Sequence, residues 1–136
     1  MESHTVQKPL KSLQKLHWLL WVRSMGVVSN FFLAEFPTKM LDRYGLRSHF
    51  NFVLDSAACG QRKPGNTIYQ LALELAGNPP PERVLFIGDH LTNDAIAPQH
   101  LGMQGIYFDR SAERSTSSPA PKDVLAIDHW HQFLPV

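Results

Sequence analysis

The chain has a single cysteine, Cys59, among its 136 residues. One cysteine cannot form a disulfide within the chain, so no covalent cross-link of this kind stabilises the fold. Small secreted domains that lack a large core depend on several such bridges, whereas proteins of reducing compartments rarely carry them. The cysteine content therefore indicates the cytosol as the compartment of this protein.

The sequence also lacks a long apolar run and a strong charge of either sign. The most apolar stretch of the N-terminal part, residues 18–22, is far shorter than the ~20 residues that cross a bilayer. No small-residue cleavage site of a signal peptide accompanies it. The net charge of +1 gives no general attraction to nucleic acid. We therefore expect neither a membrane nor a nucleic acid as partner.

Charge is nevertheless unevenly distributed along the chain. Up to Lys63 there are nine basic and four acidic residues (+5), and after it four basic and eight acidic residues (−4). A basic patch and scattered solvated charges both explain this asymmetry, and we prefer scattered charges.

Apolar segments of two kinds alternate along the chain, and this alternation predicts an α/β fold. Short apolar runs predict strands at residues 25–28, 52–54, 84–87, 106–108 and 124–127. Helical spacing predicts a helix at residues 10–20, and proline or glycine at the segment ends predicts helices at residues 35–44, 64–76 and 92–101, with a kink at Pro98 in the last. Such alternation is typical of a Rossmann-like parallel sheet with helices on both faces and right-handed crossovers.

The same pattern suggests three segments. Residues 1–24 form a tail and a helix, residues 25–110 the α/β core, and residues 111–136 a Ser/Pro-rich loop and a C-terminal helical turn.

The segment from Arg83 to Asp94 carries the clearest indication of a ligand site. A buried run ends in Gly88 and Asp89, and Asp94 falls in the first turn of the next helix. Because open α/β sheets bind ligands at the carboxyl ends of their strands, both carboxylates are expected at one crevice. Oxygen ligands of this kind suit Mg²⁺. The alternative is purely local, since aspartate is also common in turns and near helix N-termini.

Ser29, Asn30 and Lys63 also follow predicted strands. Ser29 and Asn30 end the first strand, and Lys63 lies in the loop between the second strand and a helix. In a parallel sheet these strand ends gather on one edge. A hydroxyl and backbone N–H groups can hold phosphate oxygens, and a lysine can neutralise their charge. Together with the carboxylates, these are parts that phosphoryl transfer requires.

These motifs together resemble the haloacid dehalogenase-like (HAD) hydrolase superfamily over residues 26–110, and the HAD-like hydrolase domain-containing proteins in particular. Residues 26–30 (GVVSN) are similar to the second motif of the family, residues 60–64 (GQRKP) to the third, and residues 88–94 (GDHLTND) to the fourth.

The resemblance implies Mg²⁺-dependent hydrolysis of a phosphorylated small molecule, a phosphomonoester. It implies that Ser29 and Asn30 bind the substrate and that Lys63 is catalytic, steadying nucleophile and phosphate. Asp89 and Asp94 would bind Mg²⁺.

The first motif of that family is absent. In the family an Asp-x-Asp motif supplies the nucleophile, which forms an aspartyl-phosphate, and the general acid/base. This chain has no aspartate before Asp42 and no Asp-x-Asp anywhere. The helical cap is missing as well. The chain therefore resembles a truncated hydrolase that lacks the first, central strand of its core, and we expect it to be inactive alone.

Several alternatives follow from this departure. Residues 1–22 are either a replacement sequence or a divergent family helix. The strands ending at Ser29 and Asp89 would have exposed edges, which could close together or be covered by another segment, a partner chain or a second copy.

Three functional alternatives remain besides. The chain could be such a hydrolase, a non-catalytic binding or regulatory module with weak phosphate or Mg²⁺ affinity, or a receiver-like domain with Asp55 or Asp89 as acceptor.

Overall fold

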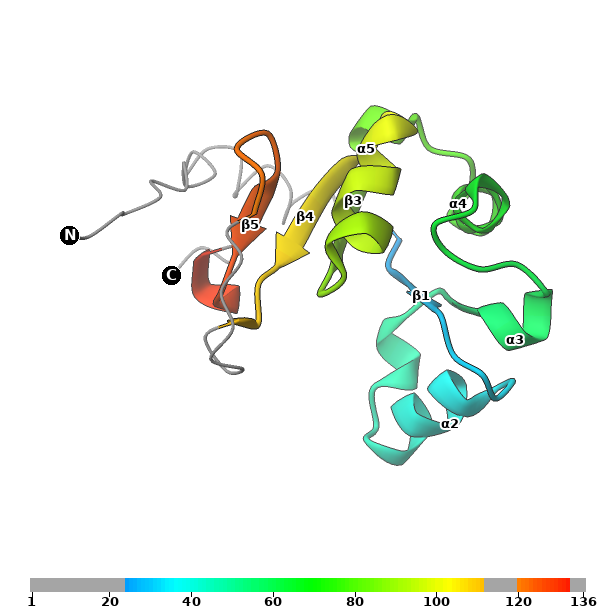
Figure 1. Ribbon diagram of the computed structural model, residues 1–136. Coiled ribbons are helices and arrows are strands. Elements are labelled where there is room, and N and C mark those ends of the chain that lie inside the picture. Colours follow the sequence, from blue (N-terminus) through cyan, green and yellow to red (C-terminus); the bar gives the residue numbers. More distant parts are fainter. Residues whose placement is uncertain (1–23, 112–119, 133–136) are drawn as a thin grey trace. The chain divides into compact units, whose positions relative to one another are not determined.

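The computed structural model describes residues 24–111 and 120–132, which form two compact units (Figure 1). The first unit comprises residues 24–84, and the second comprises the described residues from 85 onward. The predicted helix at residues 10–20 and most of the predicted loop at 111–121 lie outside the described residues. Within the described ranges, no helix is long and apolar enough to cross a membrane.

The first unit is built on two parallel strands. Its elements in chain order are β1 (Gly26–Ser29), α2 (Phe36–Arg43), η1 (Arg47–His49), β2 (Phe52–Asp55), α3 (Ser56–Cys59), α4 (Asn66–Leu75) and η2 (Pro81–Arg83). β1 pairs with β2 from Gly26 opposite Phe52 to Ser29 opposite Asp55. The two strands therefore end side by side, and the residues that follow them meet at the same edge.

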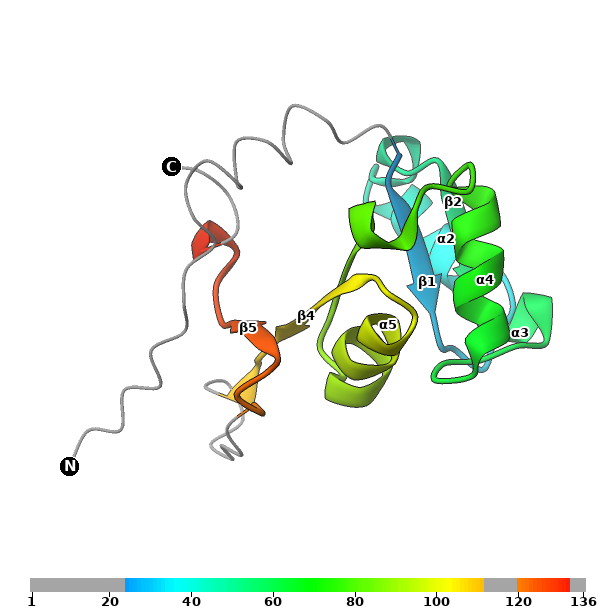
Figure 2. The ribbon, with the colours of Figure 1, turned by 90° about the horizontal axis from the view of Figure 1, so that it is seen from above.

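Helix α4 supplies the core of the first unit. It packs against β1, as Figure 2 shows. Ile68 and Tyr69 are fully buried, and Ala72, one turn further, is nearly so. These three residues form the apolar face of the helix that was predicted at 64–76. The short helix α3 was not predicted, and it begins at Asp55, whose carboxylate caps it by accepting the Ala58 N–H at 2.8 Å.

The second unit contains a three-stranded parallel sheet in the order β3–β4–β5. Its elements are β3 (Leu85–Gly88), η3 (Leu91–Ile96), α5 (Ala97–His100), β4 (Gln104–Phe108), β5 (Leu125–Ile127) and η4 (Trp130–Gln132). The central strand β4 pairs with β3 through Ile87 opposite Ile106, and with β5 through Tyr107 opposite Ala126. The segment η4 is the described part of the C-terminal helical turn predicted at 128–136.

The predicted helix at 92–101 is a π-helical segment, η3, that continues as the α-helical turn α5. At the junction the Ala97 N–H donates to the carbonyl of Thr92, five residues back. Pro98 lies in the first turn of α5, directly after this π-helical segment. The helix contacts β3 and β4, and a Cβ at Gly105 would collide with the Ala95 backbone. Gly105 therefore permits the close packing of helix on sheet.

The predicted parallel α/β architecture is confirmed. Among the described residues the strands form two sheets, and β1 and β3 each lie at an edge of their own sheet. These are the two strands predicted to flank the absent central strand. An edge strand is a template for pairing with a further strand.

Candidate functional site

In the first unit, the end of β1 meets the loop that carries Lys63. The Asn30 side chain forms two hydrogen bonds with the main chain of Lys63. Its Nδ2 donates to the Lys63 carbonyl oxygen at 2.8 Å, and the Lys63 N–H donates to Asn30 Oδ1 at 2.9 Å. Ser29, the last residue of β1, directly precedes Asn30. The structure thus brings together the three residues predicted to bind phosphate.

Lys63 is a fixed residue rather than a solvated surface lysine. Only 8% of the residue is exposed, and its backbone is held on both polar atoms by Asn30. Burial of a lysine at the end of a sheet is rare without a polar or charged partner. Lys63 is therefore held in a defined position beside the end of β1.

The loop after Asn30 is anchored on the residues that end β2. Ser56 Oγ accepts the Phe31 N–H at 3.0 Å and donates to the Phe31 carbonyl at 3.0 Å. Asp55 Oδ2 accepts the Glu35 N–H at 3.1 Å. Both carboxylate oxygens of Asp55 thus accept backbone N–H groups, and Asp55 is only 4% exposed. Its role is structural, which argues against a phosphoacceptor at this position.

Within this loop the rings of three phenylalanines are stacked, a feature that the sequence did not predict. The Phe31 ring lies between those of Phe32 and Phe36, with ring centroids 4.7 Å apart in each pair. Phe31 and Phe36 are half-buried, whereas Phe32 is 88% exposed. The stack begins two residues after Ser29, the last residue of β1, and ends at Phe36, the first residue of α2.

In the second unit, Asp94 reaches back to the end of β3. Its Oδ2 accepts the His90 N–H at 3.0 Å, and a Cβ at Gly88 would collide with its carboxylate. The Asp94 N–H in turn donates to the His90 carbonyl at 2.8 Å. Asp94 is 5% exposed. The expectation that this carboxylate points back toward the strand end is confirmed, and Gly88 provides the space.

Asp89, the first residue after β3, forms an ion pair with Arg110. Arg110 Nη1 lies 3.3 Å from Asp89 Oδ2, and the two side chains are 45% and 48% exposed. No signal in the sequence links these residues, which are 21 positions apart. The carboxylate predicted to bind a cation is therefore already partnered by a guanidinium.

The carboxylate oxygens of Asp89 and Asp94 are suitable ligands for Mg²⁺. Mg²⁺ binds carboxylate oxygens, is commonly held by one or two of them, and keeps several waters or substrate phosphate oxygens. Within residues 24–111 and 120–132, no group of three or more His, Cys, Asp or Glu side chains is close enough to hold a metal ion. That Ser29 and Lys63 of the first unit face this carboxylate pair stays a prediction.

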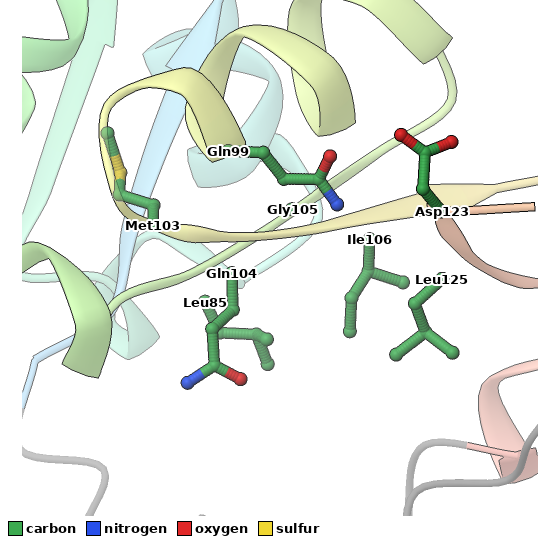
Figure 3. A pocket seen from close by; sticks show the side chains of 8 residues that line it. All are labelled: Leu85, Gln99, Met103, Gln104, Gly105, Ile106, Asp123 and Leu125. Atoms are coloured by element: carbon green, nitrogen blue, oxygen red, sulfur yellow. The ribbon is translucent and has the colours of Figure 1, made fainter. Parts of the chain in front are cut away.

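A hollow of about 280 Å³ also lies in the second unit (Figure 3). It is at the amino ends of the strands, since Leu85, Gln104 and Leu125 are the first residues of theirs. Its lining comprises Leu85, Gln99, Met103, Gln104, Gly105, Ile106, Asp123 and Leu125. The only charged residue among them is an aspartate, so the hollow is unsuited to phosphate and lies at the opposite end of β3 from Asp89.

The haloacid dehalogenase-like hydrolase family matches residues 10–102 of this sequence, more than half of the chain. The chain therefore belongs to the haloacid dehalogenase-like hydrolase family.

Two curated relatives and one solved structure illustrate this kinship. The chain is 32% identical over 105 residues to pyrimidine 5′-nucleotidase YjjG of Escherichia coli (strain K12), an alignment that covers 77% of this chain and 46% of that protein. It is 36% identical over 111 residues to haloacid dehalogenase-like hydrolase domain-containing protein 3 of Bos taurus, covering 82% and 41% respectively. The predicted kinship with such domain-containing proteins is confirmed.

The chain spans less than half the length of both relatives. A HAD phosphatase from Thermococcus onnurineus superimposes with a TM-score of 0.65 at 22% identity, over 83% of this chain and 50% of that one. At this level of identity the superposition shows the fold.

Proposed function

We propose that the chain carries the phosphate-binding and cation-binding parts of a phosphomonoester hydrolase site and performs no turnover by itself. One combination supports this. Asn30 holds Lys63 beside the end of β1, next to Ser29, while the 136 residues contain no Asp-x-Asp to attack phosphorus. A hydroxyl and an ammonium group at a strand end suit the oxygens of a phosphorylated small molecule.

Asp89 and Asp94 are the residues that would hold Mg²⁺ in this proposal. The ion would neutralise charge on the phosphate oxygens, which is its general role in phosphoryl transfer. The surrounding residues of the chain orient these two aspartate side chains. Asp94 is fixed by the His90 N–H, and Asp89 Oδ2 must leave Arg110 before this oxygen can take a cation.

The attacking aspartate must come from outside these 136 residues if hydrolysis is to occur. We propose the edge of β1 as the place where a strand of a partner chain or a second copy pairs, because β1 is bordered by only one strand among the described residues. The alternative is a non-catalytic binding or regulatory module with weak phosphate and Mg²⁺ affinity. The absence of a nucleophile supports this module as much as it supports a site completed by another chain. The single cysteine suits a cytosolic location for either form.

Turnover is the direct test. The purified chain is incubated with p-nitrophenyl phosphate and Mg²⁺, and released phosphate is measured alongside an Asp89→Asn variant. We expect no release above background from either protein. Robust Mg²⁺-dependent release that Asp89→Asn abolishes would overturn the proposal, because it would require a nucleophile within this chain.

Binding of inorganic phosphate tests the remaining half of the proposal. Titration calorimetry should detect phosphate binding that Ser29→Ala and Lys63→Met weaken. Lys39→Met is the matched control, since Lys39 lies in α2 of the same unit with a 72% exposed side chain. Equal weakening by Lys63→Met and Lys39→Met would indicate general electrostatic attraction and contradict a defined phosphate site. Circular dichroism of each variant identifies any loss of fold.

A further inference from the structure

The three stacked phenylalanine rings end in a ring with a free outer side. Phe36 and Phe31 are nearly parallel, with 8° between their planes, and Phe32 continues the stack at 24°. The centroids of the Phe31 and Phe32 rings are 4.7 Å apart, and Phe32 is 88% exposed, so most of its ring still faces solvent. A flat apolar group placed on its outer side would extend an existing stack and remove an exposed aromatic surface from water.

The backbone that presents Phe32 is fixed at both ends. On one side, Ser56 holds the N–H and the carbonyl of Phe31. On the other, Asp55 holds the Glu35 N–H, and Glu35 adopts the left-handed conformation with φ 62°. The Phe36 N–H donates to the Leu33 carbonyl at 3.3 Å, which closes the loop. A ring in such a loop requires little ordering when a ligand stacks on it, which favours binding.

Phe32 is also close in the chain to Ser29, the first of the residues proposed to bind phosphate. It is three residues after Ser29, so their Cα atoms are at most about 11 Å apart. A nucleoside monophosphate spans a comparable length between its base and its phosphate. A phosphorylated sugar offers the same phosphate and no planar ring.

We propose that Phe32 stacks on a planar aromatic group of the phosphorylated ligand, so that this chain prefers nucleoside monophosphates over sugar phosphates. The proposal rests on the proposed function, because it takes Ser29, Asn30 and Lys63 as the phosphate site. It adds to that function the kind of molecule to which the phosphate is attached, namely one with a planar aromatic group. The stack is indifferent to the identity of the base, since every base has an aromatic face.

The test compares four ligands, of which uridine monophosphate and ribose 5-phosphate differ only in the base. Uridine monophosphate, ribose 5-phosphate, inorganic phosphate and uridine are titrated into the full chain, and weak binding is followed by saturation-transfer NMR. We expect uridine monophosphate to bind roughly 5- to 150-fold more tightly than ribose 5-phosphate, the factor that one base–aromatic stack provides. Saturation should transfer from the protein to the base protons.

Variants of Phe32 separate the stack from the phosphate site. Phe32→Ala should remove the preference for uridine monophosphate and leave the affinity for inorganic phosphate unchanged. Phe32→Leu should have the same effect, because leucine is apolar but has no ring on which the base can stack. Phe32→Trp should retain the preference. Tyr44→Ala is the matched control, because Tyr44 is a 67% exposed aromatic residue of the same unit outside this loop.

The possible failures are distinguishable. Equal affinities for uridine monophosphate and ribose 5-phosphate would refute the stacking proposal while the phosphate site stands. A preference that Phe32→Ala leaves intact would also refute it. Absence of binding by all three phosphorylated ligands and by uridine would refute this proposal together with the proposed function.

Discussion

Replacement of Arg110 by alanine should increase the affinity of the second unit for Mg²⁺. Arg110 occupies Asp89 Oδ2 at 3.3 Å, and a cation that takes this oxygen must displace the guanidinium. The two side chains are 45% and 48% exposed, so the pair belongs to the class of exposed ion pairs. Such pairs contribute about 0.2–1 kcal/mol. Since about 1.4 kcal/mol corresponds to a tenfold change in affinity, Arg110→Ala should bind Mg²⁺ about 1.4- to 5-fold more tightly.

The measurement is a titration of Mg²⁺ by calorimetry, repeated with Mn²⁺ by electron paramagnetic resonance. Asp89→Asn should abolish binding in either background. Arg43→Ala, which removes a positive charge from α2 of the first unit, is the matched control and should leave the affinity unchanged.

Salt provides an independent check of the same reasoning. The advantage of Arg110→Ala should shrink between low and high ionic strength, because exposed charges are screened over about 10 Å at 0.1 M salt. An Arg110→Ala protein that binds Mg²⁺ no better than the original, in low salt and with Asp89 intact, would refute the competition. It would show that the cation does not compete with Arg110 for Asp89 Oδ2.

Three further substitutions test the packing on which both halves of the site depend, each by urea unfolding followed by circular dichroism. Asn30→Ala removes both hydrogen bonds to the Lys63 main chain, and we expect a loss of about 1–3 kcal/mol in the free energy of unfolding. An unchanged free energy of unfolding would mean that water replaces these two hydrogen bonds. Gly105→Ala places a Cβ against the backbone of η3 and should cost about 1–3 kcal/mol, so a neutral effect would contradict the close packing. Ile68→Ala empties a fully buried position in α4 and should cost about 2–5 kcal/mol, whereas Leu75→Ala, at a 53% exposed position of the same helix, should cost far less; similar losses would refute the assigned core.

The sequence predicted the strands because buried parallel strands are short apolar runs. Residues 52–54 and 84–87 were predicted, and β2 (Phe52–Asp55) and β3 (Leu85–Gly88) lie within one residue of them. β4 begins two residues before the predicted 106, because Gln104 and Gly105 carry no apolar signal. Gly105 belongs to the strand for a reason that only the packed helix reveals, namely its contact with the Ala95 backbone.

Short helices escaped prediction because one turn shows no periodicity. The helix α3 has four residues, and its one local signal is the capping carboxylate of Asp55. The π-helical form of η3 was likewise invisible, although the kink expected at Pro98 indicated that this helix is irregular. In both cases the element is defined by hydrogen bonds to particular neighbours rather than by an apolar face.

The candidate site was predictable only where its residues follow strands. The position of Asn30 and Lys63 at one edge followed from the parallel topology, but the hydrogen bonds that join them did not. The pairing of Asp89 with Arg110 and the ring stack around Phe31 depend on how loops return, and loop paths leave little trace in the sequence. Glu35 shows this well, since its positive φ occurs at a residue type that gives no warning of it.

The two hydrogen bonds between Asn30 and the main chain of residue 63 have a consequence for which substitutions this site can accept. Asn30 grips only main-chain atoms, which every residue type except proline offers in the same form. These two hydrogen bonds hold the main chain of residue 63 without involving its side chain. A substitution that replaces the ammonium group of residue 63 with another functional group can keep both hydrogen bonds, provided that Asn30 is retained.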